Sequence, residues 1–414
     1  MKCYTFALII FLFVGCAGST SSEVEDKTNS NIIDLAASFE NIRTVKLSEI
    51  ADSVTFIPFE TTSQSLMDQN QNGIRFSTSY IFYFDKYYDW NGKYGGTIVK
   101  RGQGPYEEVD GGYLLYKDNH FYSKGSKFIE YDITGKPTGK VRNLYASREF
   151  SGRDFLRKGT GFSSVGENFI IYDYPKVIYF FNKNFETVSS RELIRTDSST
   201  NNLVYLGGYS DAVSYYKDMV IFYNGFNDTI FQIKATGLEP RWVVNFNHPS
   251  RYLLVIDEGK RRSWADELNR ALRGQISFSN LESIKNSEGK HSVHAVYETE
   301  SCVFFFMKEL INFPEMRGLT PPDPYIVYHD KNSGKITRVK GKGFVDDLLG
   351  MDFFYPKLGI FNEKMITYIW PFELLNYIKE CKEKGREVNP KLITLSKQVK
   401  EDDNPVLILF HLKK

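Results

Sequence analysis

Residues 118–136 read Asp118-Asn-His-Phe-Tyr-Ser-Lys-Gly-Ser-Lys-Phe-Ile-Glu-Tyr-Asp-Ile-Thr-Gly-Lys136, and they carry the clearest fold signal in the chain. Two short runs rich in aromatic residues, beginning at His120 and Lys127, are separated by a turn that contains Gly125. A second turn follows at once and contains Asp132 and Gly135. Because Asn, Asp and Gly supply the positive φ angles that tight hairpins need, this stretch predicts a β-hairpin.

The same pair of strands recurs along the chain. A polar residue precedes the first strand of each pair, and these six landmarks are Ser79, Asn119, Asn168, Asp218, Ser301 and Glu363. Successive landmarks lie 40, 49, 50, 83 and 62 residues apart. Since a propeller blade takes about 40 to 50 residues, the repeat predicts an all-β, six-bladed β-propeller with four-stranded antiparallel blades. An eight-stranded sandwich is the alternative, but it does not explain the spacing.

The two ends of the repeat array predict how the ring closes. Residues 53–60 form a strand that has no blade of its own, and residues 404–411 form a strong strand at the other end. We expect the first to join the last blade, which would remove two exposed sheet edges. Two short helical insertions are predicted at about residues 255–285 and 371–400, because apolar residues recur there at helical spacing. Such insertions either cover loops or form a lid or partner surface.

The N-terminus predicts export. Residues 1–15 contain a short apolar run after Lys2, which is typical of a signal peptide and too short to span a bilayer. The run ends at Gly15-Cys16, which resembles a lipobox whose cysteine is acylated. Residues 16–41 are predicted to be a lipidated Cys16 followed by a flexible tether, because residues 17–31 are rich in Ser, Thr and acidic residues. The propeller is assigned to residues 42–414.

The stretch Arg101-Gly-Gln-Gly-Pro-Tyr-Glu-Glu108, taken with residues 118–136, resembles an NHL-type propeller repeat. Over about residues 42–414 the chain is similar to a family of six-bladed β-propeller lipoproteins of Bacteroidota that carry a domain of unknown function. The matching features include the opening at residues 47–60 and the ending at residues 403–410. The resemblance implies a propeller anchored in the cell envelope, at the outer membrane, and it brings no established catalytic residues.

Composition narrows the class of partner. Lys and Arg total 52 against 51 Asp and Glu, so no basic excess points to a nucleic-acid partner. After loss of Cys3 and acylation of Cys16, only Cys302 and Cys381 would remain. A disulfide between them is left open, and a four-cysteine metal site is excluded. No cofactor is expected, although a metal ion bound in the central channel remains an alternative.

Aromatic residues give the first candidates for binding. Tyr87, Tyr88 and Trp90 cluster in one hairpin, where they could stack on sugars or anchor a partner, or could pack between blades. Packing is the favoured interpretation. Arg101 and Trp264 are the further candidate ligand contacts. The Gly102-Gln-Gly-Pro105 turn is interpreted as structural, because Pro105 lacks the amide that a phosphate loop would use and a strand follows it.

Four histidines are candidate ligands for a metal ion, namely His248, His291, His294 and His329. His291 and His294 lie three residues apart in a predicted strand, so their side chains should point to opposite faces and cannot share one metal ion.

The sequence therefore favours a lipid-anchored envelope propeller that binds or scaffolds a glycan, a peptide or a partner protein. The alternative is a metal-dependent lyase or hydrolase with its site at the central channel. His, Asp and Arg converging on the inner strands would favour the enzyme, whereas aromatic and neutral polar groups would favour binding.

Overall fold

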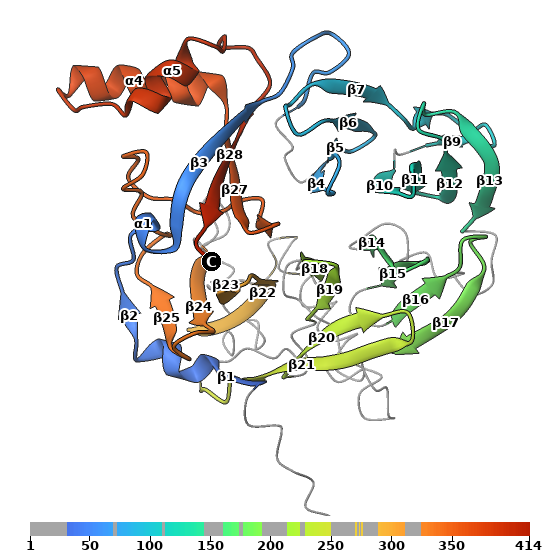
Figure 1. The fold of residues 1–414 in the computed structure, drawn as a ribbon, viewed down its shortest axis with the longest axis horizontal. Helices are drawn as coiled ribbons and strands as arrows, with labels where there is room; N and C mark the ends of the chain where they lie inside the picture. The colour runs from blue at the N-terminus through green and yellow to red at the C-terminus, as the bar shows by residue number, and fades with distance from the viewer. Residues whose placement is uncertain are drawn as a thin grey trace, which may run out of the picture.

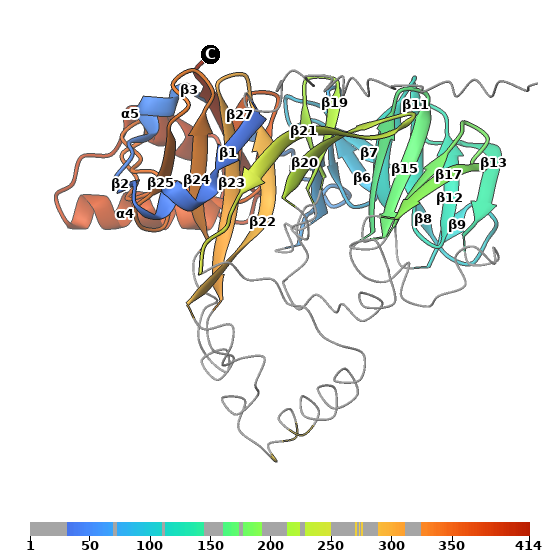
Figure 2. The same ribbon diagram turned by 90° about the horizontal axis from the view of Figure 1, so that it is seen from below.

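The computed structural model describes residues 31–68, 73–109, 112–144, 160–173, 177–192, 213–223, 228–249, 289–310 and 324–414, with residues 270, 273 and 275. Within these ranges, six sheets of four or five strands are arranged around a ring, and one further sheet has two strands (Figure 1). Figure 2 shows the ring edge-on, with the helical insertion α4–α5 at one end. The predicted all-β, six-bladed propeller is confirmed.

Each blade places its first strand toward the centre of the ring and its fourth at the rim (Figure 1). Blade one contains β4 (Ile74–Phe76), β5 (Ile81–Tyr83), β6 (Lys86–Tyr88) and β7 (Tyr94–Thr97). Blade two contains β10 (Tyr113–Lys117), β11 (His120–Lys124), β12 (Lys127–Tyr131) and β13 (Pro137–Asn143). Blade three contains β14 (Thr160–Val165), β15 (Asn168–Asp173), β16 (Val177–Phe181) and β17 (Thr187–Glu192).

The second half of the ring follows the same plan. Blade four contains β18 (Val213–Tyr216), β19 (Met219–Phe222), β20 (Thr229–Lys234) and β21 (Gly237–Asn245). Blade five contains β22 (Lys290–Glu298), β23 (Cys302–Leu310), β24 (Tyr325–Asp330) and β25 (Ile336–Val339). Blade six contains β26 (Ile360–Phe361), β27 (Lys364–Ile369), β28 (Val406–Leu412) and β3 (Ala51–Pro58). The strand pair that recurs in the sequence occupies the second and third positions of each blade.

The ring closes as predicted. β3 pairs antiparallel with β28, so that Val54 lies opposite Phe410 and Ile57 opposite Leu407. A strand from the start of the fold therefore completes the last blade.

The tether prediction is wrong for residues 32–41. β1 (Ile32–Asp34) pairs in parallel with β21, and β2 (Ile42–Arg43) pairs in parallel with β25. The 3-10 helix η2 (Leu35–Phe39) joins them, and a short helix α1 (Leu47–Ile50) leads into β3. Ile33 and Leu35 are fully buried, so they anchor this segment to the ring. Blades four and five consequently have five strands.

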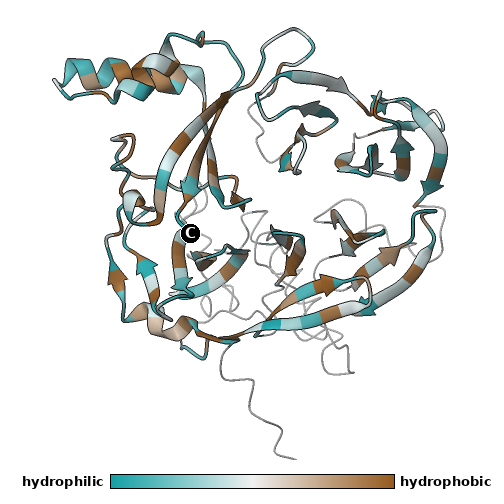
Figure 3. Ribbon diagram, viewed as in Figure 1, coloured by the Kyte–Doolittle hydropathy of each residue, from teal (hydrophilic) through white to brown (hydrophobic). Residues whose placement is uncertain are grey.

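Apolar packing joins every blade to the next. The described core divides into six clusters, and each lies at one junction between neighbouring blades. In β11, for example, Phe121 packs toward blade one while its neighbour Tyr122 packs toward blade three. Since successive strand residues face opposite sides, a strand buried on both faces needs consecutive apolar residues. Figure 3 shows these apolar residues in the strands around the ring.

The landmark residues mark the hairpin turns. Asp118 and Asn119 adopt φ angles of 50° and 59° between β10 and β11, and Asn362 and Glu363 adopt 47° and 58° between β26 and β27. Two consecutive positive φ angles are typical of the tight turns whose twist matches that of the flanking strands.

The second helical insertion is confirmed as α4 (Pro371–Glu383) and α5 (Pro390–Ser396). Leu374 and Leu392 are fully buried and join the core cluster between blades five and six, so these helices pack against the outer side of the ring (Figure 1). The first insertion, at about residues 255–285, lies outside the described residues except at 270, 273 and 275. Cys302 and Cys381 are both buried and free, with no disulfide between them. Within the described residues, no helix has the length and apolar character needed to cross a membrane.

Candidate functional site

Aromatic and hydroxyl side chains occupy the first strands of several blades. The hydroxyls of Ser163 on β14 and Tyr215 on β18 are 2.5 Å apart and hydrogen-bonded. The Tyr215 ring meets Phe361 on β26 edge to face, with the ring centroids 6.2 Å apart. Burial raises the pKa of the Tyr215 phenol, which therefore stays protonated. On blades one and two, the Arg75 guanidinium lies 5.6 Å from the centroid of the Tyr113 ring.

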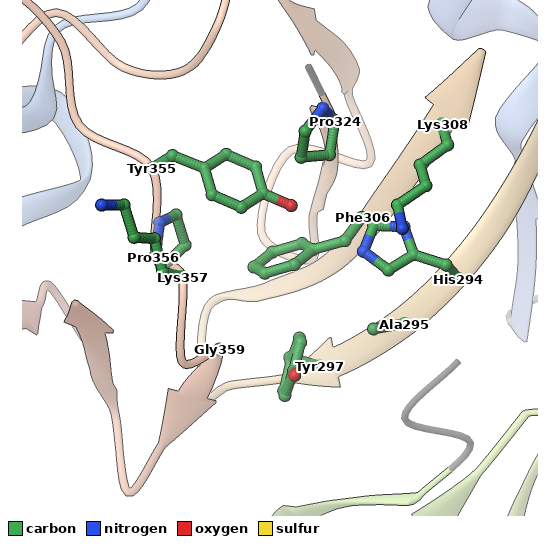
Figure 4. A pocket seen from close by; sticks show the side chains of 10 residues that line it. All are labelled: His294, Ala295, Tyr297, Phe306, Lys308, Pro324, Tyr355, Pro356, Lys357 and Gly359. Atoms are coloured by element: carbon green, nitrogen blue, oxygen red, sulfur yellow. The ribbon is translucent and has the colours of Figure 1, made fainter. Parts of the chain in front are cut away.

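A cavity of about 310 Å³ lies between blade five and the segment that leads into blade six (Figure 4). The described residues that line it come from β22, β23 and the loops before β24 and β26, and they are His294, Ala295, Tyr297, Phe306, Lys308, Pro324, Tyr355, Pro356, Lys357 and Gly359. Aromatic rings and prolines make up most of the wall, and a few polar groups interrupt it. Such a composition is typical of a small-molecule site.

A β-bulge places His294 in this cavity. On β22, Val293 lies opposite Met307 and Ala295 lies opposite Phe306, so His294 is the extra residue. A bulge redirects the side chain of the inserted residue, and here the imidazole lies 6.2 Å from the Phe306 ring. His291, on the other face, contacts the rings of Phe39 and Tyr325 instead. The prediction that the two histidines face opposite sides is confirmed.

Among the described residues, two buried polar atoms in the cavity have no hydrogen-bond partner, namely His294 Nδ1 and Tyr355 Oη. Burial, and then the nearby positive charge of Lys308, lower the pKa of His294 to about 3. Burial raises the pKa of the Tyr355 phenol. At neutral pH the imidazole is therefore uncharged and the phenol keeps its proton. An unpartnered buried polar atom costs about 1 to 3 kcal/mol, so two in one cavity point to a ligand that would satisfy them.

Gly359 holds the cavity wall close to Tyr297. Its φ is +82°, and a Cβ atom on it would lie 2.3 Å from the Tyr297 hydroxyl. Glycine is required here both for the backbone conformation and for the close approach.

A family model described as "Domain of unknown function (DUF4934)" matches residues 30–411. The chain belongs to this family. The match covers the whole ring together with β1 and β2, so these two strands belong to the DUF4934 domain.

Solved structures share the fold of this DUF4934 protein at low identity. A protein of Bacteroides fragilis that is named as exported superposes with a TM-score of 0.59 at 16% identity, covering 92% of this chain and 100% of that one. Virginiamycin B lyase from Staphylococcus aureus gives 0.32 at 12% identity, covering 70% and 74% of the two chains. BamB from Moraxella catarrhalis gives 0.31 at 11%, covering 81% and 71%. The first match shows the fold alone, and the other two carry no argument. No curated protein matches the chain.

The aromatic hairpin of blade one is packed. Tyr88 is fully buried and donates its hydroxyl to the Ser65 carbonyl at 2.6 Å, so it does not face solvent. Tyr87 packs against Phe121 with ring centroids 4.8 Å apart. Trp90 donates from Nε1 to the Ser77 carbonyl at 3.1 Å. These contacts agree with the favoured packing interpretation and leave the three rings outside the cavity.

The remaining predicted residues that the structure describes do not join the cavity either. The Arg101 side chain is exposed, with Nε 3.9 Å from Asp85 Oδ2. Trp264 and Cys16 lie outside the described residues. His248 stacks on Phe39 with centroids 4.2 Å apart, and His329 packs edge to face against Trp242. Among the described residues no group of three His, Cys, Asp or Glu side chains could hold a metal ion. Of the predicted site residues that the structure describes, only His294 lies in the cavity.

The glycine turn at residues 102–105 is structural, as predicted. It lies between β8 (Lys100–Arg101) and β9 (Glu107–Glu108), two short strands that pair in parallel. The buried Glu108 carboxylate accepts hydrogen bonds from the Ser126 backbone and side chain at 2.9 and 2.6 Å, and from the Lys127 amide at 2.9 Å. The turn thereby fastens the link between blades one and two to the hairpin of blade two.

Sequence reasoning missed Lys308, Phe306 and Tyr355. Phe306 lies in an apolar strand, and the sequence does not distinguish a residue that lines a cavity from one that packs in the core. Tyr355 and Pro356 precede Gly359, and this proline and glycine were the available signal for a loop ahead of blade six.

Proposed function

We propose that this chain is an exported propeller that is held at the outer membrane by lipid on Cys16 and binds a small ligand in the cavity between blades five and six. The observation that carries the proposal is the pair of unpartnered polar atoms, His294 Nδ1 and Tyr355 Oη, in one aromatic-walled cavity. Export and lipidation are supported by the leader that ends at Cys16, and export also by the name of the structural relative from Bacteroides fragilis.

The alternative of a metal-dependent lyase or hydrolase is less well supported. On the first strands of the blades, Arg75 lies over the Tyr113 ring, and the Tyr215 ring contacts Phe361. Aromatic rings and hydroxyls recognise ligands, whereas acid–base chemistry needs titratable pairs within hydrogen-bond reach. This set favours binding.

Ligand-observed NMR on the mature chain, residues 16–414 with Cys16→Ser for solubility, tests the binding proposal. The panel contains N-acetylglucosamine, glucuronate, N-acetylphenylalanine and a neutral dipeptide. Ala295→Trp fills the cavity with a large ring, so we expect the signal of any bound compound to disappear.

Ala37→Trp is the matched control, because Ala37 lines a separate shallow hollow beside β25. Its binding signals should equal those of the parent. If no compound binds, or if Ala295→Trp leaves binding unchanged while its circular dichroism matches that of the parent, the cavity is not a ligand site.

A further inference from the structure

The charges around the cavity are of one sign. Its described lining includes Lys308 and Lys357 and no aspartate or glutamate. The Lys357 ammonium lies over the ring of Tyr368, 4.9 Å from its centroid, and in Figure 4 this side chain extends away from His294. The Lys308 side chain instead runs toward the imidazole of His294 (Figure 4). Of these two lysines, Lys308 is therefore the one whose side chain lies near the polar group of His294.

Among the described residues, Lys308 has no carboxylate to neutralise its charge. Its cross-strand neighbour on β22 is Ser292, and Glu309 lies on the other face of β23, opposite His291. Within the described residues Lys308 forms no ion pair and no hydrogen bond. The positive charge of Lys308 also lowers the pKa of His294 and so helps to keep the imidazole neutral. A half-buried ammonium beside two unpartnered polar atoms favours a negatively charged group.

The hydrogen-bonding groups match a carboxylate. Tyr355 keeps its phenolic proton and can donate it, Lys308 has three N–H donors, and the neutral His294 donates from Nδ1 in the tautomer that carries its proton there. A carboxylate presents two oxygens that accept about four hydrogen bonds in a plane. Donors on both sides of a small cavity suit that arrangement.

The apolar walls of the cavity favour a ligand that has an apolar face as well as a carboxylate. The Phe306 ring lies with its centroid 4.9 Å from that of Tyr297 and 5.4 Å from that of Tyr355. Pro324 and Pro356 add further apolar surface. A volume of about 310 Å³ is at the small end for ligand sites, which fits one ring or one residue.

We propose that the cavity binds a compact organic carboxylate, with the carboxylate held by Lys308, Tyr355 and His294 and an apolar face against Phe306 and Tyr297. This inference rests on the proposed binding function and names its ligand class. A sugar acid and an N-acyl amino acid share this chemistry, and the experiment separates them.

Sodium benzoate and its neutral isostere benzamide are the probes, titrated by ligand-observed NMR into residues 16–414 carrying Cys16→Ser. We expect benzoate to bind at least tenfold more tightly than benzamide. Lys308→Met should weaken benzoate about tenfold, because a hydrogen bond to a charged group is lost, and should leave benzamide unchanged. Tyr355→Phe should weaken benzoate by a smaller factor. Lys335→Met, in the separate hollow beside β25, is the control and should have no effect.

Competition then identifies the source of the carboxylate. Displacement of benzoate by glucuronate indicates a sugar acid, and displacement by N-acetylphenylalanine indicates an N-acyl amino acid; either result supports the proposal. Equal binding of benzoate and benzamide, with no effect of Lys308→Met, overturns it. If neutral compounds still bind and Ala295→Trp abolishes their binding, the binding function stands and only the ligand class is wrong. If no compound responds to Ala295→Trp, both proposals fail.

Discussion

At the scale of single residues, one buried carboxylate lies where blades four and five meet. The Glu298 side chain, 1% exposed at the end of β22, accepts hydrogen bonds from Arg241 of blade four at 2.7 Å and from Lys331 of blade five at 2.6 Å. Burial alone would raise the pKa of Glu298, but the hydrogen bonds from Arg241 and Lys331 outweigh it and lower the pKa. The contact with Arg241 links blade five to blade four, and the contact with Lys331 lies within blade five.

Glu298→Gln should destabilise the fold by about 2 to 3 kcal/mol, because it leaves two partly buried cations without a counter-charge. The free energy of urea unfolding, followed by circular dichroism, measures the loss. The control is Glu300→Gln, since the Lys217–Glu300 pair is about half exposed on both sides and its atoms are 3.7 Å apart. Its effect should stay below about 1 kcal/mol. Equal effects of the two variants would show that the buried link contributes nothing.

Two buried histidines should make stability depend on pH. Burial lowers the pKa of His291 to about 4 and that of His294 to about 3, whereas an unfolded histidine titrates near pH 6.5. As the pH falls below about 6.5, the unfolded chain binds protons that the folded chain does not, so stability decreases toward pH 4.

The expected cost at pH 5 is about 1 to 2 kcal/mol for each histidine. Urea unfolding at pH 7 and pH 5 should therefore show a smaller pH effect in His291→Gln and in His294→Gln, and the smallest in the double variant. An unchanged difference between pH 7 and pH 5 in the double variant would contradict the assignment.

At the scale of strands and helices, the strands that are buried on both faces could be predicted from the sequence, whereas β1, β2 and the cavity could not. The strand pairs around residues 81–83 and 169–172 were predicted because both of their faces are buried, which produces continuous apolar runs. β1 and β2 left no such signal, because they are two or three residues long and bury only one side chain, that of Ile33. The cavity was equally hidden, since the bulge at His294 arises from the register between β22 and β23.

The N-terminal segment can be tested by substitution. Leu35 is fully buried in the cluster between blades four and five, so Leu35→Ala should cost about 3 kcal/mol of unfolding free energy. Ile32→Ala is the matched control, because Ile32 is 45% exposed and its loss should cost less than about 1 kcal/mol. Limited proteolysis should also cleave the Leu35→Ala variant sooner near residue 40. If Leu35→Ala is as stable as the control, the segment is a tether after all.

At the scale of the whole molecule, the ring is a scaffold whose architecture does not determine activity. All six junctions between blades are filled by apolar clusters, so each blade is held on both sides. Propellers support many unrelated functions, and function must be argued from local sites. Here those sites are the cavity beside His294 and the proposed anchor at Cys16.

The anchor gives the prediction at this scale. If Cys16 carries acyl chains, the protein should sediment with membranes of its native host, because buried hydrocarbon binds strongly to a bilayer. Cys16→Ser should move it to the soluble fraction and abolish labelling by an alkyne-tagged fatty acid. Cys3→Ser is the matched control, because Cys3 lies within the predicted signal peptide and its loss should change neither readout. Labelling that persists in Cys16→Ser would place any lipid elsewhere, and an unlabelled, soluble parent protein would mean that export ends in release from the membrane.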